Sequence, residues 1–156
     1  MAGRIIIAGD GQMGLVMAAA ALEAGVAEVT VWGPFEESVD VLRAHRESSR
    51  LPGWPIPDAV EITADPAAFR DASLAVNAIP TQFVRPVWTR LRDALATGTP
   101  VVSTAKGLEA GTGRRPTEIL AELLPGSATA VLSGPTIAAE LARRQPAVMV
   151  LSLIHI

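Results

Sequence analysis

Short apolar runs alternate with longer segments of mixed polarity along most of the chain. Many of these runs are rich in β-branched residues, which is typical of strands that are buried on both faces of a parallel sheet. We expect such strands at residues 4–8, 28–32, 61–63, 74–77, 101–104, 128–132 and 147–151.

The segments between these strands predict helices where apolar residues recur at intervals of three or four. We expect helices within residues 15–26, 35–42, 84–95, 116–124 and 136–144. The second is a polar helix with Phe35, Val39 and Leu42 expected on one side. Pro116 suits the first position of its helix, because an N–H there would have no partner inside the helix. Residues 46–57 contain three prolines and a glycine, which predicts a loop.

Strands that alternate with helices indicate an α/β fold, a doubly wound, mainly parallel Rossmann-type sheet with helices on both faces. In such a sheet, ligands bind beyond the carboxyl ends of the strands, where the strand order reverses. The glycine loop that starts at Gly9, the turn at Pro80 and Lys106 all follow predicted strands. We therefore expect Gly11, Lys106 and Thr136 to meet at one edge of the sheet.

The composition limits the class of protein and its partners. The 156 residues are 49% hydrophobic and 19% charged, which suits one globular domain over residues 1–150. A net charge of −3 without a basic face argues against nucleic acid as the main partner. No apolar run approaches the ~20 residues of a membrane span. The absence of cysteine excludes disulfides and sulfur-ligated metals. We expect no metal site and a cytoplasmic location.

Residues 9–14 read Gly-Asp-Gly-Gln-Met-Gly and fit the pattern G-x-G-x-x-G. They lie between a predicted strand and a predicted helix, which is the context that this motif requires. Its glycines allow a tight turn and let the backbone approach a pyrophosphate, which then rests on the helix N-terminus. We expect Gly9, Gly11 and Gly14 to bind a dinucleotide, NAD or NADP. The alternative is a purely structural glycine turn.

Two features count against dinucleotide binding, and the second also leaves the choice between NAD and NADP open. Asp10 places a carboxylate inside the loop, where it would repel a pyrophosphate unless its side chain points away. No acidic residue ends the second predicted strand, where a ribose 2′-hydroxyl would be held, and Glu36 or Glu37 is the nearest substitute. Arg43 and Arg46 would meet a 2′-phosphate or, as on most polar helices, point into solvent.

Lys106 is the single lysine among thirteen basic residues, so arginine serves wherever a solvated charge suffices. An ammonium is a compact point charge, which suits a small anion better than a wide guanidinium does. The alternative is an ordinary surface lysine.

With the sequences Lys-Gly-Leu-Glu at 106–109 and Ser-Gly-Pro-Thr at 133–136, the chain resembles bacterial NAD(P)-dependent glycerol-3-phosphate dehydrogenase. The resemblance implies an enzyme that interconverts dihydroxyacetone phosphate and sn-glycerol 3-phosphate for glycerophospholipid synthesis. It implies that Lys106 contacts cofactor and substrate, that Gly134 and Thr136 line the substrate site, and that the Ala138 backbone approaches the cofactor. A helix that begins near Thr136 would offer N–H groups and a hydroxyl to an anion. The alternative is a strand-to-helix turn with a hydroxyl cap.

The chain departs from the family's usual pattern within the glycine loop and after the second strand. Gln12 and Met13 stand where the family has serine and an aromatic residue. The resemblance implies that these two positions contact the cofactor, here with different side chains. Pro34 stands where a basic residue is common. Backbone N–H groups bind most of a pyrophosphate, so the family assignment does not depend on these positions.

The resemblance also implies a second, helical half that supplies the catalytic lysine and much of the substrate pocket. We expect that domain to be absent here, so the chain should hold no catalytic residue of its own. Residues 151–156 break with the preceding composition and look like the translation of a sequencing adapter, which predicts a non-native tail in place of a genuine strand. The resemblance is compatible with a homodimer of the whole enzyme. The alternatives are a ketopantoate reductase-like enzyme and a non-catalytic dinucleotide-binding module.

Overall fold

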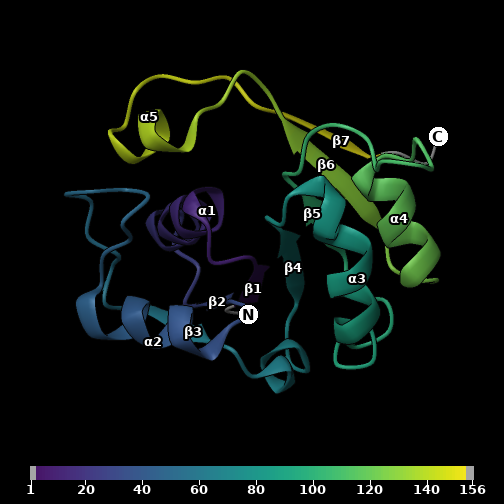
Figure 1. Ribbon diagram of the computed structural model, residues 1–156, viewed down its shortest axis with the longest axis horizontal. Helices are drawn as coiled ribbons and strands as arrows, with labels where there is room; N and C mark the ends of the chain where they lie inside the picture. Colours follow the sequence, from purple (N-terminus) through teal and green to yellow (C-terminus); the bar gives the residue numbers. More distant parts are fainter. Residues whose placement is uncertain (1–2, 154–156) are drawn as a thin grey trace.

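The computed structural model describes residues 3–153, which form a sheet with helices on both of its faces (Figure 1). The strands are β1 (Arg4–Ala8), β2 (Glu28–Trp32), β3 (Val60–Thr63), β4 (Leu74–Asn77), β5 (Val101–Ser103), β6 (Thr129–Ser133) and β7 (Val150–Leu153). The helices are α1 (Gln12–Glu23), α2 (Glu36–His45), α3 (Thr81–Leu91), α4 (Pro116–Leu123) and α5 (Ala138–Ala142), with one 3₁₀ turn, η1 (Pro66–Phe69).

The strand order is β3-β2-β1-β4-β5-β6-β7. Strands β1 to β6 are parallel, and β7 joins β6 in the antiparallel sense. The chain crosses from β3 back to β4 beside β1, so the order reverses between β1 and β4. The expected doubly wound, mainly parallel Rossmann-type sheet is confirmed, and this reversal marks the edge where such sheets bind ligands.

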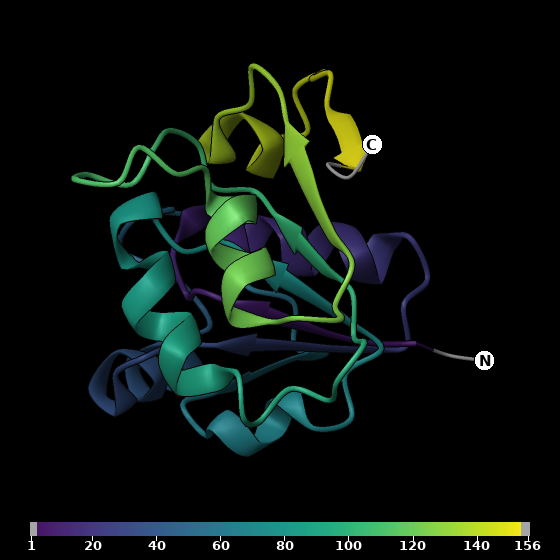
Figure 2. The same ribbon diagram turned by 90° about the vertical axis from the view of Figure 1, so that its right-hand side faces the viewer.

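Two hydrophobic clusters cover the two faces of the sheet. On one face, α1, α2 and α5 pack on alternate residues of the central strands, such as Ile7 and Val31. On the other face, α3, α4 and η1 pack on Ile6, Ala8 and Trp32. Figure 2 is turned so that α3 and α4 lie toward the viewer, in front of the sheet. Consecutive strand residues point to opposite faces, which explains why each strand is apolar at nearly every position.

Three aromatic side chains form the centre of the cluster under α3. The Phe69 ring lies edge-on to both Trp32 and Trp88, with ring centroids 5.9 Å apart in each pair. The indole Nε1 of Trp32 donates to the Ala64 carbonyl oxygen, 3.0 Å away, so the buried donor of that ring is satisfied. The contacts of the Phe69 ring with Trp32 and Trp88 join η1 to the end of β2 and to α3.

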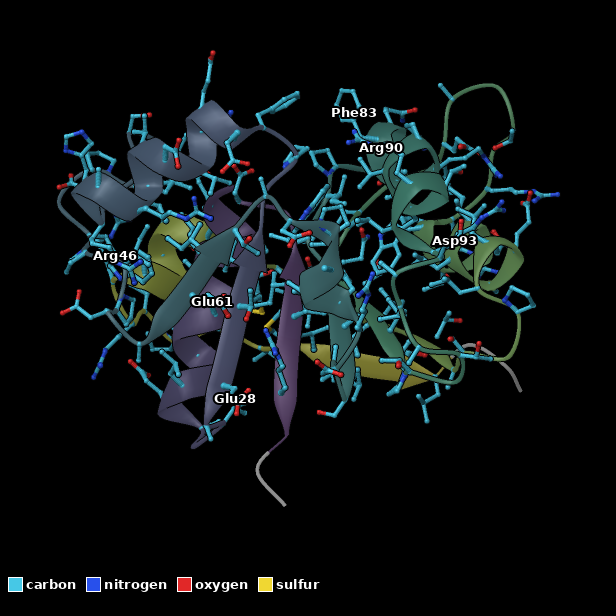
Figure 3. All side chains as sticks on the ribbon, turned by 90° about the horizontal axis from the view of Figure 1, so that it is seen from below. Glu28, Arg46, Glu61, Phe83, Arg90 and Asp93 are labelled. Atoms are coloured by element: carbon cyan, nitrogen blue, oxygen red, sulfur yellow. The ribbon has the colours of Figure 1, made fainter. Side chains whose placement is uncertain are left out.

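Polar side chains form a row across the three neighbouring strands β3, β2 and β1. The Glu61 carboxylate of β3 accepts a hydrogen bond from Thr30 Oγ1 (2.9 Å) and one from Arg4 Nη2 (3.4 Å). Figure 3, in which the molecule is seen from below, labels Glu61 of this row. In the same view, Phe83 and Arg90 are labelled on α3, which lies on the other side of the molecule from Arg46.

Some predicted boundaries differ from the structure. Phe35 precedes α2 as its cap and is 70% exposed, whereas Val39 and Leu42 are buried, so the prediction that Phe35 lies with them on one side of the helix was wrong. The last helix starts at Ala138 and not at Thr136, because the Thr136 side chain and carbonyl contact Lys106 instead. The last strand starts at Val150 and pairs with β6, and all of its side chains are exposed. Residues 154–156 lie outside the described residues.

Within residues 3–153, no helix is both long and apolar enough to cross a membrane.

The start of α4 gives a testable dependence on pH. The Glu118 side chain accepts hydrogen bonds from Nη2 and the backbone N–H of Arg115, at 2.9 and 2.8 Å. These bonds lower the pKa of Glu118 from 4.5 to about 2. A carboxyl whose pKa is lower in the folded state stabilises the fold above its unfolded pKa and loses this effect as the pH falls toward the folded pKa. The stabilisation should therefore disappear between about pH 4.5 and pH 2.

We expect Glu118→Gln to flatten the decrease of Tm on acidification over that interval, measured by circular dichroism. The control is Glu37→Gln, which changes an exposed carboxyl of α2. Equal slopes for Glu118→Gln and the original chain would contradict the prediction.

Candidate functional site

The glycine loop connects β1 to α1 at the edge where the strand order reverses. The Gly9 N–H donates to the Trp32 carbonyl oxygen at 2.8 Å, so the loop begins beside the end of β2. Gly9 has φ +122°, a conformation that side chains disfavour, and a Cβ there would lie 2.8 Å from the Ala78 carbonyl oxygen. A Cβ on Gly14 would lie only 1.9 Å from the Gly9 carbonyl oxygen. The first and third glycines are thus required by packing within the chain.

Gly11, the second glycine, has open space where a side chain would begin. The nearest atom to its hypothetical Cβ is Arg50 Nη1, at 3.8 Å, and its φ of −78° is ordinary for any residue. Gly11 caps α1, and the first N–H groups of a helix have no acceptors within it. Such a site accepts a phosphate group that approaches the backbone closely. The shape of the loop therefore fits a dinucleotide pyrophosphate.

Arg50 and Gln12 border the opening above Gly11. Gln12 Nε2 donates to the carbonyl oxygen of Arg50, which ties the 46–57 loop to the start of α1. The Arg50 guanidinium thus adds a positive charge beside the open glycine. This position of Arg50 could not be predicted from the sequence, because nothing in the order of residues brings its loop beside the glycines.

The Asp10 side chain points away from the opening of the loop. Its Oδ2 accepts a hydrogen bond from Ser38 Oγ of α2 at 2.8 Å. The same oxygen lies 2.6 Å from the position that a Cβ on Gly33 would occupy. The carboxylate is therefore directed toward the turn between β2 and α2. Repulsion of a pyrophosphate, which the sequence left open, is avoided by this orientation.

Lys106 lies beyond the end of β5 and contacts the segment after β6. Its Nζ donates to the carbonyl oxygen of Gly134 (2.8 Å) and to the carbonyl oxygen and Oγ1 of Thr136 (both 3.2 Å). Among the described residues, no carboxylate forms a salt bridge with this ammonium. The lysine is held by neutral acceptors, so its positive charge is not cancelled locally.

Parallel strands are spaced about 4.8 Å apart, so β5 lies roughly 10 Å from β1, with β4 between them. Lys106 and the glycine loop therefore follow the ends of two strands on the same edge, separated by β4. Thr136 joins this edge through its contacts with Lys106.

A buried amide fixes the start of the loop that carries Lys106. Asn77 Nδ2 donates to Ser103 Oγ at 2.9 Å, and its Oδ1 accepts from Trp88 Nε1 at 2.8 Å. The Asn77 carbonyl oxygen accepts from both N and Oγ1 of Thr104, at 2.9 and 3.1 Å. Thr81 Oγ1 also donates to the carbonyl oxygen of Lys106 at 2.6 Å. These contacts position the lysine backbone.

Glu109, the last residue of the Lys-Gly-Leu-Glu segment, anchors the loop to α3. Its carboxylate accepts two hydrogen bonds from Arg85, at 2.8 and 3.0 Å, and one from Thr112 Oγ1 at 2.5 Å. The hydrogen-bonded Arg85 guanidinium holds the pKa of Glu109 below its usual range. Glu109 therefore stabilises the loop in its ionised form.

The segment after Ser133 packs tightly behind Lys106. A Cβ on Gly134 would lie 2.2 Å from the carbonyl oxygen of Val148, so the backbone at this position requires glycine. Ala138 starts α5, is buried, and packs in the cluster that contains α1. Ile137 caps the helix without a side-chain hydrogen bond, so the alternative of a strand-to-helix turn with a hydroxyl cap is not what the structure shows.

Arg43 and the C-cap residue Arg46 of α2 contact backbone carbonyls of β3 and of the segment before it. Arg43 Nε donates to the Ile62 carbonyl oxygen at 2.7 Å, and its Nη1 contacts Asp40 and Glu36. Arg46 Nη2 donates to the carbonyl oxygens of Pro57 and Val60, the latter at 2.9 Å. Both side chains therefore hold neighbouring backbone and are not simply solvated.

A family model described as the NAD-dependent glycerol-3-phosphate dehydrogenase N-terminus matches residues 4–155. The chain belongs to this family. The resemblance that the Lys-Gly-Leu-Glu and Ser-Gly-Pro-Thr segments suggested is thereby confirmed.

Curated relatives carry the name glycerol-3-phosphate dehydrogenase (NAD(P)+). A protein of Rhodopseudomonas palustris is 39% identical over 142 residues, which cover 91% of this chain and 43% of that protein. A protein of Thermobifida fusca is 38% identical over 153 residues, which cover 96% of this chain and 46% of that protein. The chain thus spans less than half the length of these relatives.

Solved structures show the same fold. Glycerol-3-phosphate dehydrogenase from Coxiella burnetii superimposes with a TM-score of 0.87 at 28% identity, over 96% of this chain and 46% of that one. A pyrroline-5-carboxylate reductase from the same organism has a TM-score of 0.64 at 18% identity, over 89% of this chain and 46% of that one. The second likeness shows the fold alone, so fold does not distinguish these reductases.

The glycines provide a matched pair of substitutions. Gly14→Ala should destabilise the chain by about 1–3 kcal/mol, because its Cβ would overlap the Gly9 carbonyl oxygen. Gly11→Ala should leave Tm nearly unchanged, since its Cβ meets no atom closer than 3.8 Å, and should weaken the binding of NADH. Thermal unfolding and NADH fluorescence measure the two effects. A Gly11→Ala chain that binds NADH as well as the original would contradict this assignment.

Proposed function

We propose that this chain is the cofactor-binding domain of an enzyme that reduces dihydroxyacetone phosphate to sn-glycerol 3-phosphate with NADH or NADPH, for glycerophospholipid synthesis. The observation that carries the proposal is the common edge of two sites, the open glycine loop and the Lys106–Gly134–Thr136 contact. The first suits a dinucleotide and the second suits a small anion. Membership of the glycerol-3-phosphate dehydrogenase family supports the assignment of a dinucleotide site and an anion site to one edge of the sheet.

In this proposal the bound dinucleotide supplies the hydride, and the protein binds and orients the reactants. Gly9, Gly11 and Gly14 admit the pyrophosphate to the first turn of α1, where Gln12 and Met13 border it. The backbone of Ala138 borders the cofactor from the other side of the edge.

Lys106 neutralises the phosphate of the substrate. An ammonium has three donors, and here they contact the Gly134 and Thr136 oxygens. A phosphate oxygen exchanges with one of these neutral acceptors, which gives a stronger, charge-assisted hydrogen bond. Gly134 and Thr136 then border the substrate.

The proton for the forming alkoxide comes from a group outside the described residues, in a helical domain that completes the pocket. The relatives' additional length supports this division of labour. That residues 151–156 are a non-native tail and that the protein is cytoplasmic both stay predictions.

We expect Lys106→Met, in the chain completed with its second domain, to lower kcat/KM for dihydroxyacetone phosphate by about 10- to 100-fold. A hydrogen bond to a charged group contributes roughly 1.5–3 kcal/mol, which gives this range. Lys106→Arg should also be poor, because a guanidinium does not replace a point charge.

Arg90→Met is the control, since it removes an exposed basic residue of α3. Unchanged kinetics in both Lys106 variants would make Lys106 an ordinary surface residue.

The 156-residue chain alone should bind dinucleotide weakly, if at all, and should not turn over dihydroxyacetone phosphate. General acid–base catalysis contributes about 10²–10⁴-fold, and loss of positioning removes more. Oxidation of NADH and NADPH, followed by absorbance, compares this chain with one completed from the native gene. Comparable turnover by both would overturn the proposed division into two domains, and binding without turnover by both would favour a non-catalytic module.

A further inference from the structure

We propose that the Asp10 carboxylate binds the adenosine ribose of the dinucleotide and selects NAD(H) over NADP(H). The proposal rests on the proposed function and makes it more specific. It assigns to a residue of the glycine loop a task that Rossmann-type proteins usually give to an acidic residue at the end of β2.

The usual position of that acid holds none in this chain. After Trp32, the turn from β2 to α2 continues with Gly33 and Pro34. Glu36 follows, but its carboxylate pairs with Arg43 Nη1 at 3.3 Å on the outside of α2. A ribose held beyond β2 would therefore find no carboxylate at the carboxyl end of β2 or in the turn itself, since the only acid of this strand, Glu28, stands at its start.

Asp10 places its carboxylate in the space that a side chain at position 33 would fill. The hypothetical Cβ of Gly33 would lie 2.6 Å from Asp10 Oδ2, 2.8 Å from Asp10 Cγ and 2.9 Å from Val39 Cγ2. Any larger residue at position 33 would collide with this carboxylate. The acid is thus supplied from the neighbouring strand end, and Gly33 leaves room for it.

Two backbone contacts and one side chain fix this arrangement. The Gly9 N–H donates to the Trp32 carbonyl oxygen at 2.8 Å, and the Gly33 N–H donates to the Thr63 carbonyl oxygen at 2.9 Å. Ser38 Oγ holds Asp10 Oδ2 at 2.8 Å. Within the described part of the chain, no hydrogen bond reaches Oδ1. That oxygen remains able to accept from a ribose hydroxyl.

The same carboxylate would repel the 2′-phosphate of NADP(H), because like charges at close range disfavour binding. The basic residues near this turn are engaged elsewhere. Arg43 contacts the Ile62 carbonyl oxygen and two acids, and Arg46 contacts backbone carbonyls. Arg50 lies above Gly11, beside the pyrophosphate that both dinucleotides share.

Binding of NADH and NADPH to the 156-residue chain tests the proposal without any turnover. Isothermal titration calorimetry gives both dissociation constants, and ADP-ribose and 2′-phospho-ADP-ribose repeat the comparison without the nicotinamide. We expect the original chain to prefer NADH by about 10-fold or more, and the preference should shrink as salt screens the charges. Asp10→Asn keeps the shape of the side chain and should remove most of the preference, chiefly through tighter NADPH binding.

Glu37→Gln is the matched control, because it removes an exposed carboxylate of α2 that holds none of the arginines in the described part of the chain, and it should leave the preference unchanged. Ser38→Ala should weaken the preference partly, since Asp10 loses its anchor. Thermal unfolding shows whether each variant is folded. The salt dependence of the original chain tests the proposal even if Asp10→Asn does not fold.

Several outcomes would overturn the proposal. A preference for NADPH in the original chain would do so, as would a salt-independent preference. Equal losses of NADH and NADPH binding in a folded Asp10→Asn chain would reduce Asp10 to a structural link between the loop and α2. If the original chain binds dinucleotides but Asp10→Asn leaves the ratio unchanged, only this inference fails. If neither dinucleotide binds to this chain or to the chain completed with its second domain, the proposed function fails with it.

Discussion

Asn77 joins three elements at the carboxyl edge of the sheet through one fully buried amide. Its side chain contacts Ser103 of β5 and Trp88 of α3, and its carbonyl oxygen accepts twice from Thr104. A buried polar group left without a partner costs about 1–3 kcal/mol, so each contact constrains the others. The start of the loop that carries Lys106 is therefore fixed by the core and does not depend on the loop's own exposed residues.

This constraint sets the distance between two binding features of different character. The glycine loop offers backbone N–H groups and open space at Gly11, whereas Lys106 offers a full charge on a side chain held by neutral oxygens. The backbone dipoles suit an anion that approaches closely along the helix axis. The ammonium suits a smaller, mobile anion, because its contacts with Gly134 and Thr136 are readily exchanged. The strand ends keep these two features apart.

The sequence predicted the architecture well because strands buried on both faces leave uninterrupted apolar runs. Strands β1, β2 and β4 have the predicted bounds, and Pro116 begins α4 as expected. The errors lie at helix starts. Phe35 shares the helical spacing of Val39 yet stands outside α2 and is exposed. Thr136 contacts Lys106, and its helix starts only at Ala138. The contact with Lys106 joins residues that are distant in the sequence, so local periodicity does not reveal it.

The orientation of Asp10 was the feature that the sequence left most open. A carboxylate inside a glycine loop reads as unfavourable, because the pattern gives its position along the chain and not its direction. Its direction depends on Gly33 and Ser38, which are distant in the sequence and meet it only when β1 and β2 pair.

Five glycines at this edge of the sheet differ in what surrounds them. Carbonyl oxygens of the chain fill the space beside Gly9, Gly14 and Gly134, and the Asp10 carboxylate fills the space beside Gly33. Only Gly11 of these five is left without a close neighbour. Four glycines therefore bring protein groups together, and the fifth leaves the opening that a ligand can enter. A motif match alone treats the three glycines of the loop as equivalent, whereas their surroundings separate the structural positions from the binding position.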